Sequence, residues 1–186
     1  MRIFISVLLL IFVFQSFTKA DDIRDFEIEG MSIGDSALDY FSEAKILSNK
    51  KNWYRDNKFY GVLIDIKSDN FNSIQLHFKT NDTKYKIYAL GGLKDFIDNP
   101  KDCYPLKKEV DIGLQNIFKN SKINHTKKRK HPADKTGKSF VTQSFFDLDN
   151  GAVVTACYDM GENYDSDFRI IVNTEEIDKW YGIAYD

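Results

Sequence analysis

Three stretches in the first half of the chain alternate apolar and polar residues, which is the pattern of a β-strand with one buried face. Phe59 to Ile66 has apolar side chains at every second position, and Ile74 to Phe78 alternates cleanly with polar residues. Tyr85 to Leu90 is a third candidate, which Gly91 and Gly92 would close. Turn-forming residues separate the three stretches. The pattern predicts an antiparallel meander with one buried face.

A capping signal precedes the first predicted helix. Ser32 is followed three residues later by Asp35, so a hydroxyl can accept from a free helical N–H and a carboxylate can lie at the positive end of the helix dipole. We therefore expect a helix that begins near Ile33. Its apolar face, which would pack against the sheet, consists of Ala37, Leu38 and Phe41.

The second half of the chain has the same order of elements. Pro105 would begin a helix, and Thr174 would cap a closing one. Three strands are expected between these helices, and Asn150 and Gly151 mark a tight hairpin turn. The predicted strands are Phe140 to Leu148, Ala152 to Tyr158 and Phe168 to Val172, and the apolar residues of the middle helix are Leu106, Val110, Leu114 and Ile117.

This order of elements predicts an α+β fold, with an antiparallel sheet and helices packed on one face. It also suggests two halves of one helix and three strands each, followed by a last helix. The residues themselves show no repeat, so the duplication is a hypothesis about topology alone.

Residues 1–20 have the pattern of a secretory signal peptide. Arg2 precedes an apolar run from Ile3 to Phe14, and Thr18 and Ala20 are small enough for cleavage by signal peptidase. The run is too short for an ordinary membrane-spanning helix, and no second candidate follows. Residues 21–186 are therefore expected to form one exported α+β domain, in the periplasm or outside the cell. An uncleaved N-terminal anchor is the alternative.

Charge and cysteine content narrow the chemistry. The chain has a formal net charge of −2, and the loss of Arg2 and Lys19 with the signal peptide leaves 24 basic and 28 acidic side chains, a net charge near −4. This balance gives no general attraction to nucleic acid or to an anionic membrane. Cys103 and Cys157 are predicted to form a disulfide in an oxidising compartment. A catalytic thiol, the alternative, would need a neighbouring histidine, and the sequence places none beside either cysteine.

The run EGMSIGDSALDYFS, residues 29–42, resembles the opening of an uncharacterised family of exported bacterial proteins. That resemblance implies export and supplies no activity. The run is more loosely similar to the first helix of small α+β envelope modules of the BamE and beta-lactamase-inhibitor-protein type, from which it departs in having more polar residues later in the helix.

Residues 119–138 carry eight Lys or Arg against the single acid Asp134, without periodicity, and predict a solvated loop. Four consecutive cations, Lys127, Lys128, Arg129 and Lys130, are candidate ligand-binding residues for phosphate, lipopolysaccharide or an acidic envelope protein or polymer. A loop kept soluble by charge is the alternative. Aromatic residues for base stacking are missing from this stretch, so we do not expect nucleic acid as a partner.

No metal site and no cofactor are predicted. The candidates considered are Asp147, Asp149, Asp159 and Asp165, of which the first two resemble the start of a calcium loop. The glycine of that loop comes one residue early, and Tyr158 stands where a bidentate glutamate would be required. A hairpin turn is the preferred interpretation. The later aspartates, with Glu162 and Asp167, are expected in a solvated loop.

The three histidines do not indicate a site. His77 lies between Gln75 and Lys79 on an alternating strand, so we expect it to face solvent. His125 and His131 lie in the basic segment without a second ligand at the spacing of a zinc site.

Catalytic motifs such as Gly-x-Ser-x-Gly and His-Glu-x-x-His are missing from the sequence. The sequence therefore favours an exported, non-catalytic module that binds a protein or an envelope polymer. The alternative is a secreted or periplasmic hydrolase with an unrecognised carboxylate site, which would require the four candidate aspartates to converge in one cleft.

Overall fold

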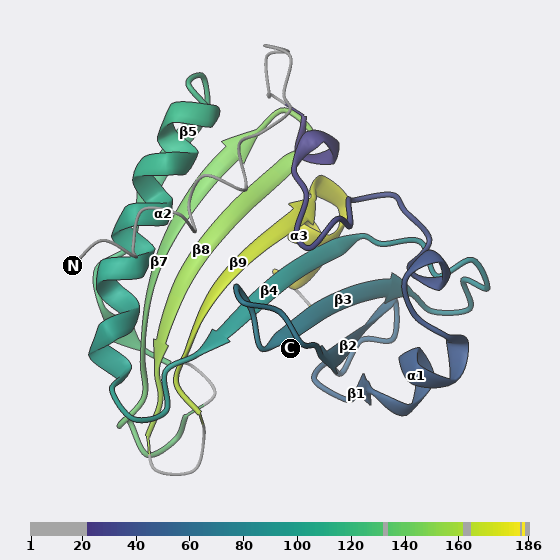
Figure 1. The fold of residues 1–186 in the computed structure, drawn as a ribbon, viewed down its shortest axis with the longest axis horizontal. Coiled ribbons are helices and arrows are strands. Elements are labelled where there is room, and N and C mark those ends of the chain that lie inside the picture. The colour runs from purple at the N-terminus through teal and green to yellow at the C-terminus, as the bar shows by residue number, and fades with distance from the viewer. Residues whose placement is uncertain (1–21, 132–133, 162–164, 183, 185–186) are drawn as a thin grey trace.

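A computed structural model describes residues 22–131, 134–161, 165–182 and 184. These residues form one antiparallel sheet in the order β1-β2-β3-β4-β9-β8-β7-β5, with β6 paired to β7 (Figure 1). The strands are β1 (Lys50–Lys51), β2 (Phe59–Asp65), β3 (Ser73–Lys79), β4 (Ala89–Asp95), β5 (Lys122–His125), β6 (Arg129–Lys130), β7 (Phe140–Leu148), β8 (Gly151–Asp159) and β9 (Asp167–Thr174). The predicted α+β class is confirmed.

Three α-helices and three short 3₁₀ turns accompany the sheet in the described residues. The helices are α1 (Glu43–Ser48), α2 (Cys103–Ile117) and α3 (Glu175–Tyr181), and the 3₁₀ turns are η2 (Ile23–Asp25), η3 (Ala37–Asp39) and η4 (Pro100–Asp102). The predicted positions of α2, α3, β2, β3, β7, β8 and β9 agree with the structure to within two residues at each end. β4 joins the two meanders because it pairs with β9 along its whole length.

The two halves of the chain are not equivalent in structure. α1 has six residues and lies beside β2, whereas α2 has fifteen residues and lies across β8 and β9. The suggested order of one helix and three strands is present twice only when the short strands β1, β5 and β6 are set aside, and the two helices occupy different positions on the sheet.

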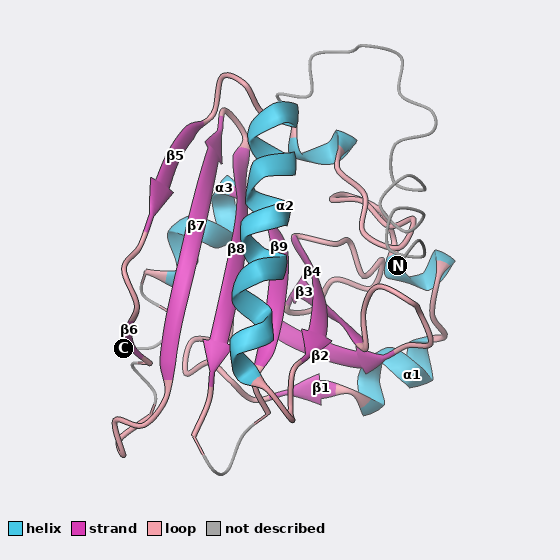
Figure 2. Cartoon of the chain, turned by 60° about the vertical axis from the view of Figure 1, so that its left-hand side comes forward, coloured by secondary structure: helices cyan, strands magenta, loops and turns pink. Residues whose placement is uncertain are grey.

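The helices lie on both faces of the sheet, which differs from the expectation of one covered face. α2 covers the face that carries Val62, Leu76 and Val172, whereas α3 packs on the opposite face against Phe59 and Ala89 (Figure 2). The reason is the alternation of strand side chains, because Phe59 and Val62 are three residues apart and point to opposite faces. A second apolar cluster on the α3 side therefore exists beside the main core.

The strand β4 lies further along the chain than predicted, because Gly91 and Gly92 are inside it and do not end it. A Cβ atom on Gly92 would lie 2.7 Å from the ring of Phe71. The glycine is therefore needed for close packing of an aromatic ring on the sheet, which is a known use of glycine within strands.

The helix predicted near Ile33 does not form there. The N–H of Ser32 donates to Asp35 Oδ2 at 2.9 Å, which closes a turn, and the N–H of Gly34 donates to the carbonyl of Ile87 at 3.0 Å. Backbone partners elsewhere in the chain thus replace helical ones. The first α-helix is α1, ten residues later, with the hydroxyl of Ser42 as its N-terminal cap.

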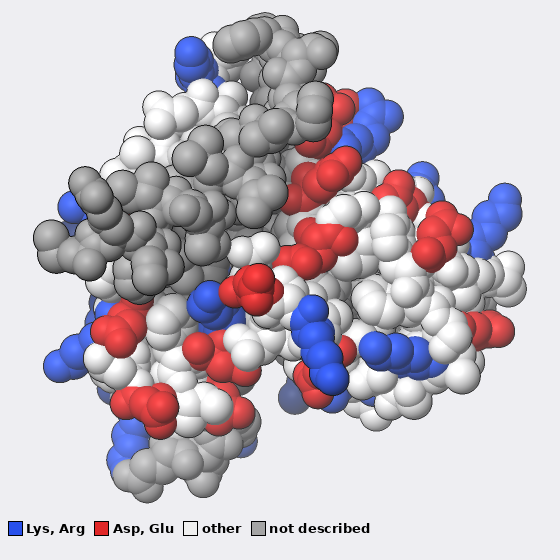
Figure 3. Space-filling model, in the orientation of Figure 1, with Lys and Arg blue, Asp and Glu red and all other residues white. Residues whose placement is uncertain are grey.

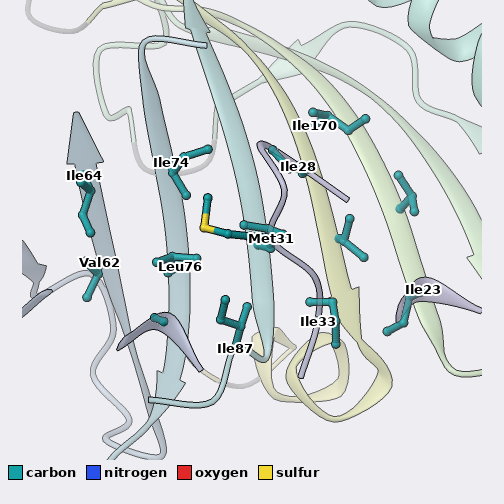
Figure 4. Close-up of a cluster of buried hydrophobic side chains, with 14 of the residues drawn as sticks. Ile23, Ile28, Met31, Ile33, Val62, Ile64, Ile74, Leu76, Ile87 and Ile170 are labelled. Carbon is teal, nitrogen blue, oxygen red and sulfur yellow. The ribbon is translucent and has the colours of Figure 1, made fainter. Parts of the chain in front are cut away.

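Residues 28–33 instead insert apolar side chains into the main core. Ile28, Met31 and Ile33 are each at most 6% exposed, and Figure 4 shows Met31 beside Leu76 of β3 and Ile28 near Ile170 of β9. This segment therefore covers part of the main core.

The predicted disulfide is present. Cys103 and Cys157 are bonded with their Cα atoms 5.9 Å apart, and both residues are buried. The bond attaches the first residue of α2 to β8.

Reduction of this disulfide should lower the free energy of unfolding by up to about 4 kcal/mol, because the bond closes a loop of more than fifty residues and restricts the unfolded chain. The measurement is urea unfolding with and without reductant. The double variant Cys103→Ala and Cys157→Ala, which has no thiol to reduce, is the control and should be insensitive to reductant. Equal stability of the oxidised and reduced wild-type protein would contradict the prediction.

Candidate functional site

Helix α2 separates two different environments on the sheet. On its β7 side it contributes to a buried polar network, and on its β9 side it forms one wall of an apolar pocket. A third cluster, aromatic and centred on His77, lies on the other face of the sheet. Each was considered as a functional site.

The polar network joins α2 to three strands. Lys107 Nζ lies 2.8 Å from Asp111 Oδ2, and the same carboxylate accepts from the hydroxyls of Ser144 and Thr155, at 2.7 and 2.5 Å. His125 Nδ1 lies 2.7 Å from Ser144 Oγ. The arrangement contains a serine beside a histidine, which is the geometry of an activated nucleophile.

Burial argues against catalysis at this network. Ser144 is 0% exposed, so a substrate cannot reach its hydroxyl. Lys107 and Asp111 are also buried, with side chains 7% and 12% exposed. The network therefore fixes α2 relative to β7 and β8, because the buried charges require these particular partners.

Replacement of Asp111 by Ala should lower the free energy of unfolding by about 3–5 kcal/mol, because the change leaves the buried ammonium of Lys107 without its counter-charge. Glu109→Ala on the exposed side of the same helix is the matched control and should change it by less than about 0.5 kcal/mol. Urea unfolding of both variants is the measurement. A similar small effect of both substitutions would show that the network does not hold the helix.

His77 is buried, and the expectation that it faces solvent was wrong. The residue is 0% exposed because α3 and the segment with Trp53 and Tyr54 cover this face of the meander. Tyr54 Oη lies 2.7 Å from His77 Nε2, and Tyr181 Oη lies 3.3 Å from the same atom. The ring is thus a hydrogen-bonded part of an aromatic core, without access to a substrate.

Burial lowers the pKa of His77 to about 3, because the charged imidazolium would lose its hydration. Below about pH 6.5 an unfolded chain protonates this histidine and the folded protein does not, so stability falls as the pH falls. As the pH is lowered from 6.5 to 4, the unfolding free energy of the wild type should therefore fall relative to that of His77→Gln by up to about 1.4 kcal/mol per pH unit. Urea unfolding at several pH values measures it, and a difference independent of pH would contradict the assignment.

The four cations of the basic segment are only partly free for a ligand. Six of its residues form β5 and β6, which pair with β7, so the segment is not the continuous loop that was predicted. Lys128 Nζ lies 2.7 Å from Asp159 Oδ2 and 4.7 Å from the ring centroid of Phe140, and Arg129 donates to Gln143 Oε1 at 2.7 Å.

Strand pairing overrides the polar composition of this segment because an edge strand can satisfy its backbone on β7 while its charged side chains face water. Lys127 and Lys130 remain exposed. His125 belongs to the polar network, and His131 packs on the ring of Tyr158, where burial lowers its pKa.

The four candidate aspartates do not converge. Asp147 and Asp149 lie at the β7–β8 turn, whereas Asp159 is the last residue of β8 and Asp165 follows it. The strand has nine residues and spans about 27 Å, which separates the two pairs. In the described part of the chain, no group of three His, Cys, Asp or Glu residues could hold a metal ion. The expected cluster partner Glu162 lies outside the described residues. The hydrolase alternative thus lacks a shared cleft for these carboxylates.

The apolar pocket, which we call the α2 pocket, has a volume of about 210 Å³. One wall is α2, another is the segment from Phe26 to Glu29, and β9 contributes Phe168 and Ile170. Phe71, the ring that packs on Gly92, also lines it. The apolar residues of the lining are Phe26, Ile28, Phe71, Val110, Leu114, Ile117, Phe168 and Ile170.

Gly113 keeps the α2 pocket open. The residue lies inside α2, where glycine is about 1 kcal/mol less favourable than alanine. A Cβ atom at this position would meet no atom within 4 Å, so packing does not require the glycine. A larger residue here would instead enter the pocket, because Gly113 lines it.

The rim of the α2 pocket is acidic. Among the residues that the structure describes, its polar lining consists of Glu27, Glu29, Glu109 and Asn70, without a lysine or arginine. Acidic side chains also lie near the centre of the molecular face in Figure 3. Within the described residues, Glu27 and Glu109 form no ion pair or hydrogen bond through their side chains, and both are exposed.

Glu29 is held at the rim by a tight turn. Ile28 and Met31 exchange backbone hydrogen bonds of 3.0 and 3.1 Å, and Glu29 and Gly30 between them have φ values of 53° and 75°. Positive φ at both central residues is the type I′ hairpin geometry. Glu29 Oε1 accepts from Ser68 Oγ at 2.7 Å, which fixes the carboxylate.

The fold and this site define an α+β protein with one antiparallel sheet, helices on both faces and an apolar pocket beside α2. No family model, curated protein or solved structure matches the chain. The resemblance of residues 29–42 to exported proteins and to BamE-like modules therefore stays a prediction. Among the described helices, none is long and apolar enough to cross a membrane.

Sequence reasoning did not identify the α2 pocket. One available signal was Gly113, a glycine within a predicted helix. The other was the pair Glu29-Gly30, which indicates a turn with positive φ less clearly than Asn-Gly would.

Proposed function

We propose that the protein is an exported, non-catalytic binding module, and that it binds a protein or an envelope polymer through the α2 pocket. The observation that carries this proposal is Gly113. A glycine destabilises a helix, packing does not require one at this position, and its lack of a side chain leaves the pocket open. Residues that reduce stability without a packing role are typical of functional sites.

The size and lining of the α2 pocket support this function. A cavity of about 150 Å³ lined by Leu, Ile and Phe binds benzene, so a pocket of about 210 Å³ can hold a group somewhat larger than one aromatic ring. An apolar pocket with a few polar groups at its rim is the usual form of a ligand site.

Export is part of the proposal and is supported by the disulfide, because such bonds persist mainly in oxidising compartments. The predicted signal peptide, residues 1–20, lies outside the described residues. The periplasm or the extracellular space is therefore the proposed location.

The earlier hypothesis of an acidic partner has less support. Lys128 and Arg129 are engaged within the protein, and only Lys127 and Lys130 of the four cations lack a hydrogen bond or ion pair in the described residues. The α2 pocket, with its acidic rim, favours a partner of the opposite charge.

The substitution Gly113→Leu should abolish binding of an apolar probe and also stabilise the protein. The leucine side chain would fill the α2 pocket, and its higher helix propensity should raise the free energy of unfolding by about 0.5–1 kcal/mol. The probe is 1-aminonaphthalene, a neutral fluorescent dye of two fused rings, and its fluorescence titration gives the affinity. We expect at least a tenfold loss.

Gln115→Leu is the matched control because it adds the same side chain on the exposed surface of α2. It should leave dye binding unchanged. Equal dye binding by wild type and Gly113→Leu would show that the α2 pocket is not the binding site.

A further inference from the structure

We infer that the occupant of the α2 pocket is a segment of a partner protein in which one large apolar side chain is flanked on both sides by Lys or Arg. The inference rests on the proposed function and adds the chemistry of the ligand. It follows from the size of the pocket, the position of its carboxylates and the fixed geometry of one of them.

The volume fits a single side chain. A pocket of about 210 Å³ exceeds the roughly 150 Å³ that holds benzene by less than half. It can therefore accept the ring of one Phe or Trp, or one aliphatic side chain, but not a long acyl chain. Buried aromatic anchors in a small pocket are the common hot spots of protein interfaces.

The carboxylates come from two separate walls of the pocket. Glu109 belongs to α2, whereas Glu27 and Glu29 belong to the N-terminal segment. A cationic amphiphile has one charged group and can reach one wall at a time. A peptide with cations on both sides of its apolar anchor can reach both walls, so charge complementarity favours a peptide segment.

One of these acceptors is already positioned. The type I′ turn holds Glu29 at a φ of 53°, and Ser68 Oγ and Asn70 Nδ2 donate to its Oε1 at 2.7 and 3.3 Å. The other carboxylate oxygen of Glu29 has no hydrogen bond within the described residues. A pre-positioned acceptor reduces the cost of ordering side chains on binding.

A second copy of this chain does not provide the required segment in its folded state. The run Lys127 to Lys130 has no apolar residue between its cations. Lys84-Tyr85-Lys86 has the required pattern, but Tyr85 is 6% exposed and cannot leave the core without unfolding. Trp53 lies between Lys51 and Arg55 and is 39% exposed, but its ring already packs against those of Tyr54 and His77. A different protein is therefore the expected partner.

The test is an NMR titration of the ¹⁵N-labelled exported protein with the end-capped peptide Lys-Lys-Trp-Lys-Lys. The controls are Glu-Glu-Trp-Glu-Glu, which keeps the anchor, and Lys-Lys-Ser-Lys-Lys, which keeps the charges. We expect shifts at Gly113 and Ile28 and at least tenfold tighter binding of the first peptide than of either control. Binding should weaken between 0.05 and 0.5 M salt, because exposed charges are screened.

The double variant Glu27→Gln and Glu109→Gln tests the rim directly. Two exposed ion pairs should contribute roughly two- to thirty-fold to affinity, so the variant should lose that factor for Lys-Lys-Trp-Lys-Lys. Its affinity for the neutral dye should stay the same. Asp178→Asn, a carboxylate on α3 at the other face, is the control and should change neither.

The outcomes separate the inference from the function on which it rests. Dye binding that Gly113→Leu removes, with equal affinity for the basic and acidic peptides, would overturn the inference and leave the proposed function standing. Dye binding that Gly113→Leu leaves unchanged, together with equal affinity for the basic and acidic peptides, would refute both the inference and the proposed function. Tighter binding of dodecyltrimethylammonium than of the basic peptide would show that the occupant is an amphiphile and overturn the inference. Self-association that Gly113→Leu removes would overturn it in favour of a second copy of this chain.

Discussion

Two interactions of different kinds fix helix α2 over strand β8, the disulfide at its first residue and the buried pair of Lys107 and Asp111 further along. A purely apolar interface would allow the helix several rotations with similar burial. The buried pair allows only one rotation, because the carboxylate of Asp111 must accept hydrogen bonds from the hydroxyls of Ser144 and Thr155 at the same time. This rotation places Glu109 and Gly113 on the opposite flank of the helix, so the polar network on one side determines which residues face the α2 pocket on the other.

The second wall of the pocket depends on the segment before α1, which carries the most recognisable sequence motif of the chain. Ile28 and Met31 enter the core from the two ends of a tight turn, and the turn itself presents Glu29 to the rim. In this turn Met31 thus anchors the segment in the core, and Glu29 places a carboxylate at the site. A structural requirement explains the glycine and the methionine. Glu29 has a structural part as well, since its Oε1 accepts from Ser68 and Asn70, and its other carboxylate oxygen is left for a ligand.

The sequence predicted the elements whose apolar residues recur with a regular period and failed where distant contacts decide. The strands β7 to β9 and helix α2 followed from periods of 2 and 3.6. β4 was misplaced because glycine ends a strand in many sequences, whereas Gly92 accommodates Phe71. His77 was assigned to solvent because alternation identifies two faces of a strand but not whether a later helix, α3, covers the second one. The pocket could not be predicted, since its walls come from four separate segments of the chain.

Gly113 and Glu29 share a feature that connects stability to function. Glycine within a helix costs about 1 kcal/mol relative to alanine, and a non-glycine residue in the left-handed region costs roughly 1–2 kcal/mol. Together these costs are a considerable part of a typical stability of about 5–15 kcal/mol, and each could be removed by one substitution, alanine at the first position and glycine at the second. Both residues border the same pocket, one leaving space for an apolar group and the other holding a carboxylate beside it. Stability alone would favour alanine at position 113, and glycine at position 29 would relieve the backbone at the loss of two side-chain hydrogen bonds. Binding of a basic segment with an apolar anchor requires the residues that are present.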